Sequence, residues 1–319
     1  TTTTNESSSE SDNSSTSDSI SSSSTSSDPD ASSSEISISS EVLSLGYDHS
    51  CMIDDTGVVC WGSNAESQTD IPVLSNPTQV EAGYYYSCAI DDNGVTCWGR
   101  NAYGNADAPV LTNVIQVALG PFHSCALQDS PINQRLDEWI SCWGTAQATG
   151  SLEPPSIRNP IQISVGKSYS CALESNQANC WGQAPPGESG GSLFTIALSN
   201  PSQIQSLGVA VDGEDHTCAI DDNGVTCWGS DVFGITSTPL LSNPTQLSLG
   251  FDHVCALDQN EVSCWGRNTY GQTDVPNLSN PTQVSTGGDF SCVLDDTGVV
   301  CWGRNNWGQI NVPNLSNPI

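Results

Sequence analysis

The chain has 319 residues, of which 36 are acidic and only six are Lys or Arg, so its formal net charge is −30. Nucleic acids and anionic membrane surfaces are bound by clustered cations, and six scattered ones do not provide such a cluster, so neither is expected as a partner. No run of about 18 apolar residues exists that would span a bilayer.

Residues 1–37 are expected to form a Ser/Thr-rich, disordered or extended tail. Of the first 40 residues, 26 are Ser or Thr, seven are acidic and none is aromatic. Such a segment cannot bury enough apolar surface to offset its ordering entropy, so it is typical of a stalk or linker. Glycosylation sequons occur at Asn5, Asn13, Asn277 and Asn314. The chain begins with Thr and carries no apolar signal, which indicates a processed form whose export signal is absent.

Residues 38–319 are a repeat with a period of 37 residues. Fourteen cysteines form seven successive pairs, six of them separated by eight residues, and each second cysteine is followed by Trp-Gly. A glycine stands five residues before each first cysteine. The pairs are Cys51 with Cys60, Cys88 with Cys97, Cys125 with Cys142, Cys171 with Cys180, Cys218 with Cys227, Cys255 with Cys264, and Cys292 with Cys301. Insertions lengthen the third and fourth units at 128–140 and 183–198.

Each cysteine pair is expected to lie in a β-hairpin. In residues 87–98 two β-prone runs flank an Asp-Asp-Asn-Gly turn, the pattern of a tight hairpin. A two-residue loop at Asp92-Asn93 would place Cys88 opposite Cys97, within reach of a disulfide. Metal ligands and nucleophiles are the alternatives, but no Cys-x-x-Cys or zinc-finger spacing is present. Seven disulfides indicate an oxidising compartment, and no metal is expected.

Units of about 40 residues with four short strands and a repeated Trp are typical of propeller blades. We therefore predict an all-β, seven-bladed propeller with almost no helix. The N-terminal strand, about Ile38–Gly46, supplies the element missing after the last repeat. It is expected to pair in the last blade and to close the ring. Cohesion between blades is assigned to the seven repeated Trp rings, since the disulfides do not join one blade to the next.

The runs Gly-x-x-His-Ser-Cys-Ala-Leu and Cys-Trp-Gly-Arg-Asn-x-Tyr-Gly-Gln resemble regulator-of-chromosome-condensation repeats. The run from Trp265 to Pro276 is similar to the secreted bacterial type of this family, which includes a propeller-type β-lactamase inhibitor. The resemblance covers residues 38–319 and implies a seven-bladed propeller, but it does not fix the function. The nucleotide-exchange activity known in the family is not carried over, because this chain is acidic and carries paired cysteines.

Two groups of side chains are of types found in catalytic or metal sites, but each group recurs at one position of the repeat. His49, His123, His216 and His253 stand two residues before a first cysteine, where other units hold Tyr86, Tyr169 or Phe290. We interpret this slot as structural and assign no catalytic residue. The Asp pairs at 54–55, 91–92, 221–222 and 295–296 fall at hairpin turns, where Asp is favoured. None matches a calcium loop, so no cofactor is assigned, although weak surface calcium binding stays open.

Aromatic residues at variable slots are the candidates for partner binding. Tyr47, Tyr84, Tyr85, Phe122 and Phe251 lie between the repeated glycine and the His slot, and Tyr103, Phe233, Tyr270 and Trp307 lie five residues after a repeated Trp. Other units hold Glu66 or Lys167 there, so these slots are expected to face solvent at blade ends. Exposed aromatics among acids favour a protein-binding surface, with packing between blades as the alternative.

The leading hypothesis is a secreted or cell-surface, non-catalytic propeller that binds a protein, with a basic patch on the partner favoured by the acidic charge. One alternative is a structural subunit of an extracellular assembly or filament that uses the N-terminal tail as an arm for self-association. Another is a proteinaceous inhibitor of an extracellular enzyme. The third is a propeller lyase or glycosidase, whose acid and base would lie in one of the two insertions.

Overall fold

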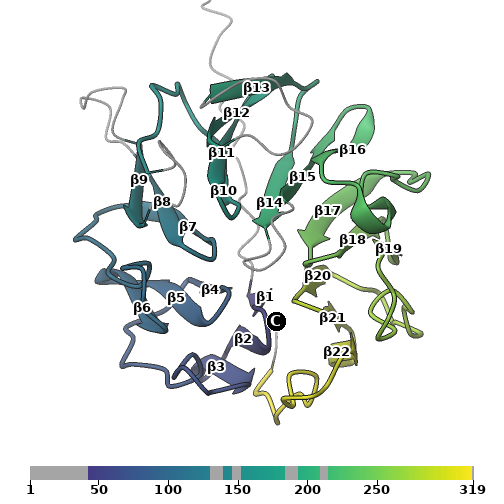
Figure 1. The fold of residues 1–319 in the computed structure, drawn as a ribbon. Helices are drawn as coiled ribbons and strands as arrows, with labels where there is room; N and C mark the ends of the chain where they lie inside the picture. Colours follow the sequence, from purple (N-terminus) through teal and green to yellow (C-terminus); the bar gives the residue numbers. More distant parts are fainter. Residues whose placement is uncertain (1–41, 130–138, 146–151, 184–192, 209–214, 318–319) are drawn as a thin grey trace, which may run out of the picture. The chain divides into compact units, whose positions relative to one another are not determined.

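The computed structural model describes residues 42–129, 139–145, 152–183, 193–208 and 215–317, which form seven antiparallel sheets arranged as the blades of a propeller (Figure 1). The inner strand of each blade contacts the inner strand of the next, from β1 and β4 round to β20 and β1. The tail predicted for residues 1–37 lies outside the described residues. The all-β, seven-bladed fold predicted from the repeat is confirmed, and the one helical element in the described part is a 3₁₀ turn, η1 (Val232–Gly234).

The blades are numbered in chain order. Blade 1 contains β1 (Leu43–Leu45), β2 (His49–Asp54) and β3 (Gly57–Gly62), blade 2 contains β4 (Gln79–Ala82), β5 (Tyr86–Asp91) and β6 (Gly94–Gly99), and blade 3 contains β7 (Val114–Leu119), β8 (His123–Gln128) and β9 (Ile140–Gly144). Blade 4 contains β10 (Gln162–Val165), β11 (Tyr169–Glu174), β12 (Gln177–Gly182) and β13 (Leu193–Ala197), and blade 5 contains β14 (Gln203–Gly208), β15 (Asp215–Asp221) and β16 (Gly224–Gly229). Blade 6 contains β17 (Pro244–Leu249), β18 (His253–Asp258) and β19 (Glu261–Gly266), and blade 7 contains β20 (Gln283–Thr286), β21 (Phe290–Asp295) and β22 (Gly298–Gly303).

The second and third strands of each blade form the hairpin expected from the cysteine spacing. In blade 2 Asp91 pairs with Gly94, so Asp92 and Asn93 form a two-residue loop, and Gly94 has a φ of 109° that favours glycine. Cys88 then lies directly opposite Cys97.

All seven predicted cysteine pairs form disulfides, each within one hairpin, and the described residues contain no free cysteine. The first cysteine of each pair lies on the middle strand of its blade and the second on the third strand, so every bridge joins two directly opposed positions. The bridges join Cys51 to Cys60, Cys88 to Cys97, Cys125 to Cys142, Cys171 to Cys180, Cys218 to Cys227, Cys255 to Cys264, and Cys292 to Cys301.

The prediction of four strands per blade is wrong for six of the seven blades, which have three. Among the described residues only blade 4 has a fourth strand, β13, which pairs with β12 and comes from the insertion at 183–198. Elsewhere the segment after the Trp-Gly pair carries prolines, such as Pro72, which cannot donate to a ladder. The polar groups of this segment bond the following blade instead. The backbone oxygen of Gln68, for example, accepts a bond from Trp98 Nε1 at 2.9 Å.

The prediction that the N-terminal strand completes the last blade is also wrong. β1 pairs with β2 and is the inner strand of blade 1. Only the short turn 46–48 separates the two strands, so local pairing needs almost no loop closure. The C-terminal segment 304–317 closes the ring instead, because it leaves blade 7 and packs on blade 1. There Gln309 O accepts bonds from Trp61 Nε1 (2.9 Å) and Ser50 Oγ (3.0 Å), and Ser316 N donates to Asp54 Oδ2 (2.8 Å).

The repeated Trp rings do contribute to cohesion between blades, as expected. Five of them donate from Nε1 to a carbonyl in the segment arriving from the preceding blade, over 2.8–2.9 Å. They are Trp61, Trp98, Trp143, Trp265 and Trp302. Each also packs within an apolar cluster. Indole rings with both an apolar body and a donor suit a position where a sheet meets a polar loop.

A second link between blades was missed in the sequence. Six inner strands carry a Gln directly before an apolar residue, and its side-chain amide bonds the backbone of the next inner strand. Gln203, for example, accepts from Leu247 N (2.6 Å) and donates to Leu247 O (3.1 Å). We call this contact the glutamine clamp. Its members are Gln79 on Val117, Gln116 on Ile163, Gln162 on Ile204, Gln203 on Leu247, Gln246 on Val284 and Gln283 on Leu43. Blade 1 has Val42 at this position.

Substituting Gln203 by Ala is expected to lower the free energy of unfolding by about 2–4 kcal/mol, because the Leu247 N–H and C=O lose their partners in a buried seam. Guanidinium unfolding followed by Trp fluorescence measures the change. The substitution Val42→Gln is the matched gain-of-clamp variant, and it is expected to leave stability unchanged or raise it. Equal stability of Gln203→Ala and the wild type would show that the clamp contributes nothing.

Candidate functional site

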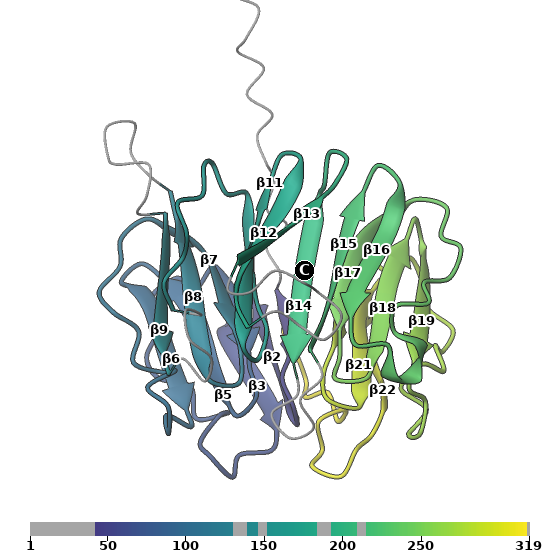
Figure 2. The same cartoon turned by 45° about the horizontal axis from the view of Figure 1, so that its top comes forward.

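The two ends of the propeller differ in chemistry. The strand register brings the turn before each middle strand next to the segment that follows the third strand, since Tyr86 pairs with Gly99 in blade 2. This end holds all nine aromatic candidates, and we call it the aromatic end. The hairpin turns with the Asp pairs lie at the opposite end of the strands, which we call the hairpin end. Figure 2 shows the blades obliquely, with the strands running between the two ends.

At the hairpin end the Asp side chains close turns, as expected from the sequence. Asp54 Oδ1 accepts from Thr56 N (2.8 Å), and Asp91 Oδ2 accepts from Ser75 N of the incoming segment (2.9 Å). Burial raises the pKa of these carboxyls, but the hydrogen bonds outweigh it, so the pKa of Asp54 lies below its ordinary value. No group of three His, Cys, Asp or Glu side chains in the described residues has the arrangement of a metal site.

The four histidines are buried and connect neighbouring blades. Nε2 of His49, His123 and His253 lies 2.8–2.9 Å from a serine hydroxyl of the following blade. Tyr86 in the same slot bonds Ser124 Oγ at 2.8 Å. Burial lowers the pKa of His49 and His253 to about 3 and that of His123 and His216 to about 4. These rings are neutral at neutral pH, and they link neighbouring blades.

The repeated glycine makes room for this ring. A Cβ built at Gly46 would lie 2.4 Å from Gly83 O of the next blade and 2.4 Å from the His49 ring. Only glycine therefore allows the ring of its own blade and the backbone of the next blade to approach together. This explains why a glycine precedes every His, Tyr or Phe in the slot.

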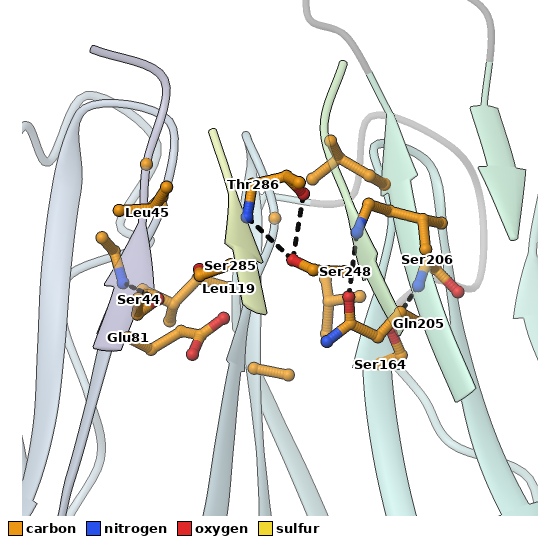
Figure 3. Close-up of a pocket in the computed structure, with 18 of the residues that line it drawn as sticks. Ser44, Leu45, Glu81, Leu119, Ser164, Gln205, Ser206, Ser248, Ser285 and Thr286 are labelled. Atoms are coloured by element: carbon orange, nitrogen blue, oxygen red, sulfur yellow. Dashed lines mark hydrogen bonds between the residues drawn. The ribbon is translucent and has the colours of Figure 1, made fainter. Parts of the chain in front are cut away.

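The central channel contains a cavity with a free volume of about 100 Å³. Figure 3 shows its lining, which is formed by the inner strands and is rich in hydroxyl groups. Most of these hydroxyl groups form hydrogen bonds between neighbouring blades. Ser44 Oγ accepts from Ala82 N at 2.9 Å, and Ser248 Oγ accepts from Thr286 N at 2.9 Å. Glu81 carries the only carboxylate among the described residues that line the channel.

Four of the aromatic candidates meet where the channel reaches the aromatic end. Tyr47 stacks on both Tyr84 and Phe251, with ring centroids 4.8 Å apart in each case, and Tyr85 packs edge-on against Tyr84 at 4.4 Å. These rings come from blades 1, 2 and 6 and are half-buried. We call them the channel rings. The interpretation as packing between blades therefore holds for part of their surface, while their outer edges remain accessible.

Tyr103 and Phe122 form a second contact at the junction of blades 2 and 3, with ring centroids 4.9 Å apart. They line a small cavity of about 50 Å³ together with Tyr84, Tyr85, Tyr86, Arg100, Asn105 and Pro121. Arg100 lies over the rings of Tyr85 and Tyr103, 5.6 and 5.7 Å from their centroids. The sequence pattern pointed to the aromatic residues here but not to the arginine.

The remaining three candidates are exposed and separate from one another. Phe233, Tyr270 and Trp307 are 52%, 43% and 56% exposed, each in the segment that runs from one blade to the next. Arg267 lies 5.3 Å from the Phe233 centroid, and Arg304 lies 5.1 Å from that of Tyr270. Both arginines are paired with aspartates, over 2.9 Å to Asp252 and 3.0 Å to Asp289. The exposure expected for this slot agrees with these three positions.

The two insertions named as alternatives for a hidden acid or base are only partly described. The described part of 183–198 forms β13, and residues 130–138 and 184–192 lie outside the described residues. In the part of the chain that the structure covers, no helix is long and apolar enough to cross a membrane.

Comparisons with known proteins concern four of the repeats and the fold. The profile of the Regulator of chromosome condensation (RCC1) repeat matches residues 42–68, 78–105, 245–272 and 282–309, which lie in blades 1, 2, 6 and 7. No curated protein sequence matches the chain.

Solved structures with the same fold include receptor ectodomains. The ectodomain of the Physcomitrella patens receptor kinase CR4 is 23% identical with a TM-score of 0.66, over 82% of this chain and 72% of that one. The CRINKLY WD40 ectodomain of the Arabidopsis thaliana receptor kinase ACR4 is 22% identical with a TM-score of 0.58, over 82% and 97%. A structure of Kap60 bound to yeast RCC1 (Prp20) matches at 14% identity and a TM-score of 0.63, over 87% and 83%. At these identities the likeness shows the fold alone.

Proposed function

We propose that this propeller, four of whose blades match the RCC1 repeat, is a secreted or cell-surface module that binds a protein through its aromatic end. The observation that carries this proposal is the gathering of nine aromatic side chains at one end, three of them more than 40% exposed. Large aromatic side chains on a rigid surface are the usual anchors of protein interfaces. Hydrogen bonds within the connecting segments, such as that from Tyr270 N to Gln272 Oε1, fix these segments before binding, so little ordering is required.

The extracellular setting is supported by chemistry and by the relatives. Seven disulfides persist only in an oxidising compartment. Two structural relatives are ectodomains of receptor kinases, and another is bound to a protein, Kap60. A non-catalytic role agrees with the use of all four histidines as buried links, since histidine is the commonest general base. The acidic charge favours a partner with basic groups around its contact site.

Replacing the three exposed rings by serine, in the variant Phe233→Ser, Tyr270→Ser, Trp307→Ser, is expected to weaken partner binding at least tenfold. The melting temperature should stay close to that of the wild type, because these rings are exposed. The partner is isolated with the wild-type chain from extracellular fluid of the source, and its affinity for each variant is then measured by surface plasmon resonance.

The matched control changes the hairpin end instead. The variant Asp92→Asn, Asp222→Asn, Asp296→Asn alters three exposed side chains and keeps their size and polarity. It is expected to bind the partner as the wild type does. Loss of binding in this control, with binding retained by the serine variant, would place the interface at the hairpin end and contradict the proposal.

A further inference from the structure

The repeat contains an arginine site that is filled in two blades and open in a third. Arg100, Arg267 and Arg304 each follow a Trp-Gly pair. Their backbone environment is the same, since each N–H donates to the carbonyl of the residue before the His slot: Tyr85 O at 2.9 Å, Asp252 O at 2.7 Å and Asp289 O at 3.0 Å. The three guanidinium groups therefore start from equivalent positions.

What differs is the side chain that meets the guanidinium. Arg267 Nη1 lies 2.9 Å from Asp252 Oδ2, and Arg304 Nη1 lies 3.0 Å from Asp289 Oδ2. In blade 2 the residue equivalent to these aspartates is Tyr85, which offers a ring face in place of a carboxylate. Within the described residues no carboxylate forms an ion pair with Arg100. The nearby Asp107 is bonded by Asn101 Nδ2 at 2.6 Å.

The same junction departs from the repeat in a second way. Gln68, Gln272 and Gln309 use Oε1 to accept a bond from the N–H two residues earlier, over 2.8–2.9 Å. Asn105 occupies this position after blade 2 and is one methylene shorter. It is 2% exposed, and its Oδ1 is buried without a hydrogen-bond partner. The shorter side chain and the flanking Tyr85 and Phe122 leave the cavity of about 50 Å³ beside Arg100.

From these two departures we propose that the Arg100 site binds an acidic side chain, Asp or Glu, of the protein partner. The carboxylate takes the place on Arg100 that Asp252 and Asp289 take on the other two arginines. Its short stem enters the cavity walled by Tyr84, Tyr103 and Phe122. A free volume of about 50 Å³ leaves room for the short stem of an acidic side chain.

The aromatic floor prepares the guanidinium for this contact. Arg100 lies 5.6 and 5.7 Å from the centroids of Tyr85 and Tyr103, which restricts its motion and removes part of its hydration. A planar guanidinium held in this way can give two parallel hydrogen bonds to one carboxylate. In a chain with a net charge of −30, an arginine that pairs with no described carboxylate is available to a partner's carboxylate. Basic groups around that carboxylate would suit the acidic surface.

This inference rests on the proposed function, because it names the group that the aromatic end recognises. The test uses the full chain in 0.15 M NaCl and a small probe, glutamate blocked at both ends as N-acetyl-glutamate amide. Binding is followed by NMR through the Nε–Hε resonance of Arg100. We expect a saturable shift with the blocked glutamate and none with blocked glutamine, which has the same shape without the charge.

Three variants sharpen the test. Arg100→Gln should weaken the probe about tenfold or more, the loss expected for a charge-assisted hydrogen bond. Arg304→Gln is the matched control, since that arginine is already paired with Asp289, and it should leave probe binding at Arg100 unchanged. Tyr85→Asp restores the repeat pattern and should abolish probe binding by filling the site from within. The reverse change, Asp289→Tyr, should open a second probe site at Arg304.

Several results would overturn the proposal. They are equal shifts with blocked glutamate and blocked glutamine, unchanged probe binding in Tyr85→Asp, or tighter binding of N-acetyl-alanine, which would assign the site to a chain terminus. If the probe fails while the serine variant of the aromatic end still loses the partner, the carboxylate site fails and the proposed function stands. If the probe binds but partner affinity depends on the hairpin end, the proposed function fails.

Discussion

Truncation of the chain after Gly303 is expected to lower the free energy of unfolding by on the order of 5 kcal/mol. The lost segment carries Ile310, Val312 and Leu315, which pack in the apolar cluster that holds Trp61. It also carries the Gln309 carbonyl that accepts from Trp61 Nε1. Without this segment blade 1 exposes its outer face, and the seam between blades 7 and 1 keeps only its inner contacts, such as the clamp of Gln283 on Leu43. Guanidinium unfolding and binding of a hydrophobic dye report the change.

Removal of the first 34 residues is the matched control, because the sequence predicts that the Ser/Thr-rich tail contributes no core. The short-tailed chain should unfold at the same denaturant concentration as the full chain. If instead the truncation after Gly303 leaves the midpoint and the cooperativity unchanged, the C-terminal segment does not close the ring.

Acid is expected to destabilise the propeller well above the pH at which carboxylates protonate. The unfolded chain protonates its histidines near pH 6.5, whereas burial lowers the pKa of the four folded histidines to about 3–4. Between these values the unfolded state binds more protons, so stability falls as the pH falls, by about 1.4 kcal/mol per pH unit for each histidine.

Two aspartates act in the opposite direction. Burial is the main cause that raises the pKa of Asp215, to about 6, and it also raises the pKa of Asp48. At pH values between the pKa of the unfolded and of the folded state, these two carboxyls bind more protons in the folded state. The folded state therefore gains stability from them as the pH falls. The net loss expected from pH 6.5 to 4.5 is on the order of 5 kcal/mol.

The substitution His253→Tyr isolates the effect of one ring. Tyrosine already fills this slot at Tyr86, where its hydroxyl bonds the serine of the next blade, so the variant should keep the link to Ser291. It should match the wild type near pH 7 and exceed its stability at pH 5. Guanidinium unfolding at both pH values, with the disulfides intact, makes the comparison. If the free energy of unfolding fell equally between pH 7 and pH 5 in the two proteins, a contribution from this histidine would be ruled out.

Most of the fold followed from the sequence because the repeat imposes its own register. Seven cysteine pairs, six of them at the same spacing, specify seven hairpins, and the Asp-Asn-Gly turn sets Cys88 opposite Cys97. The errors arose where the repeat has no local marker. The pairing of β1 with blade 1 and not blade 7 depends on loop-closure entropy, which no motif marks. The Pro-containing segment after each Trp-Gly pair has the apolar pattern of a strand, although it pairs with none. The glutamine clamp did have a signal, a Gln before an apolar residue in six units.

The candidate site could be predicted in composition but not in contacts. Variable aromatic slots pointed to one end of the blades, and Phe233, Tyr270 and Trp307 are exposed there. The stacking of Tyr47 on Phe251 joins blades 1 and 6, whose separation around the ring no local pattern encodes. The open arginine was detectable in principle, since aligning the repeats places Tyr85 where Asp252 and Asp289 stand. The significance of Tyr85 in this alignment becomes clear only once the ion pairs of Arg267 and Arg304 are known.

The central claim is that the partner binds at the aromatic end, and hydrogen–deuterium exchange of the chain with and without the isolated partner tests it most directly. Protection is expected in the segments around Tyr84 to Tyr85, Arg100 to Asn105, and Arg304 to Gln309, which lie at that end of the strands. The hairpin turns at 54–57, 91–94 and 295–298 should exchange at the same rate in both samples. Protection confined to those turns would contradict the claim.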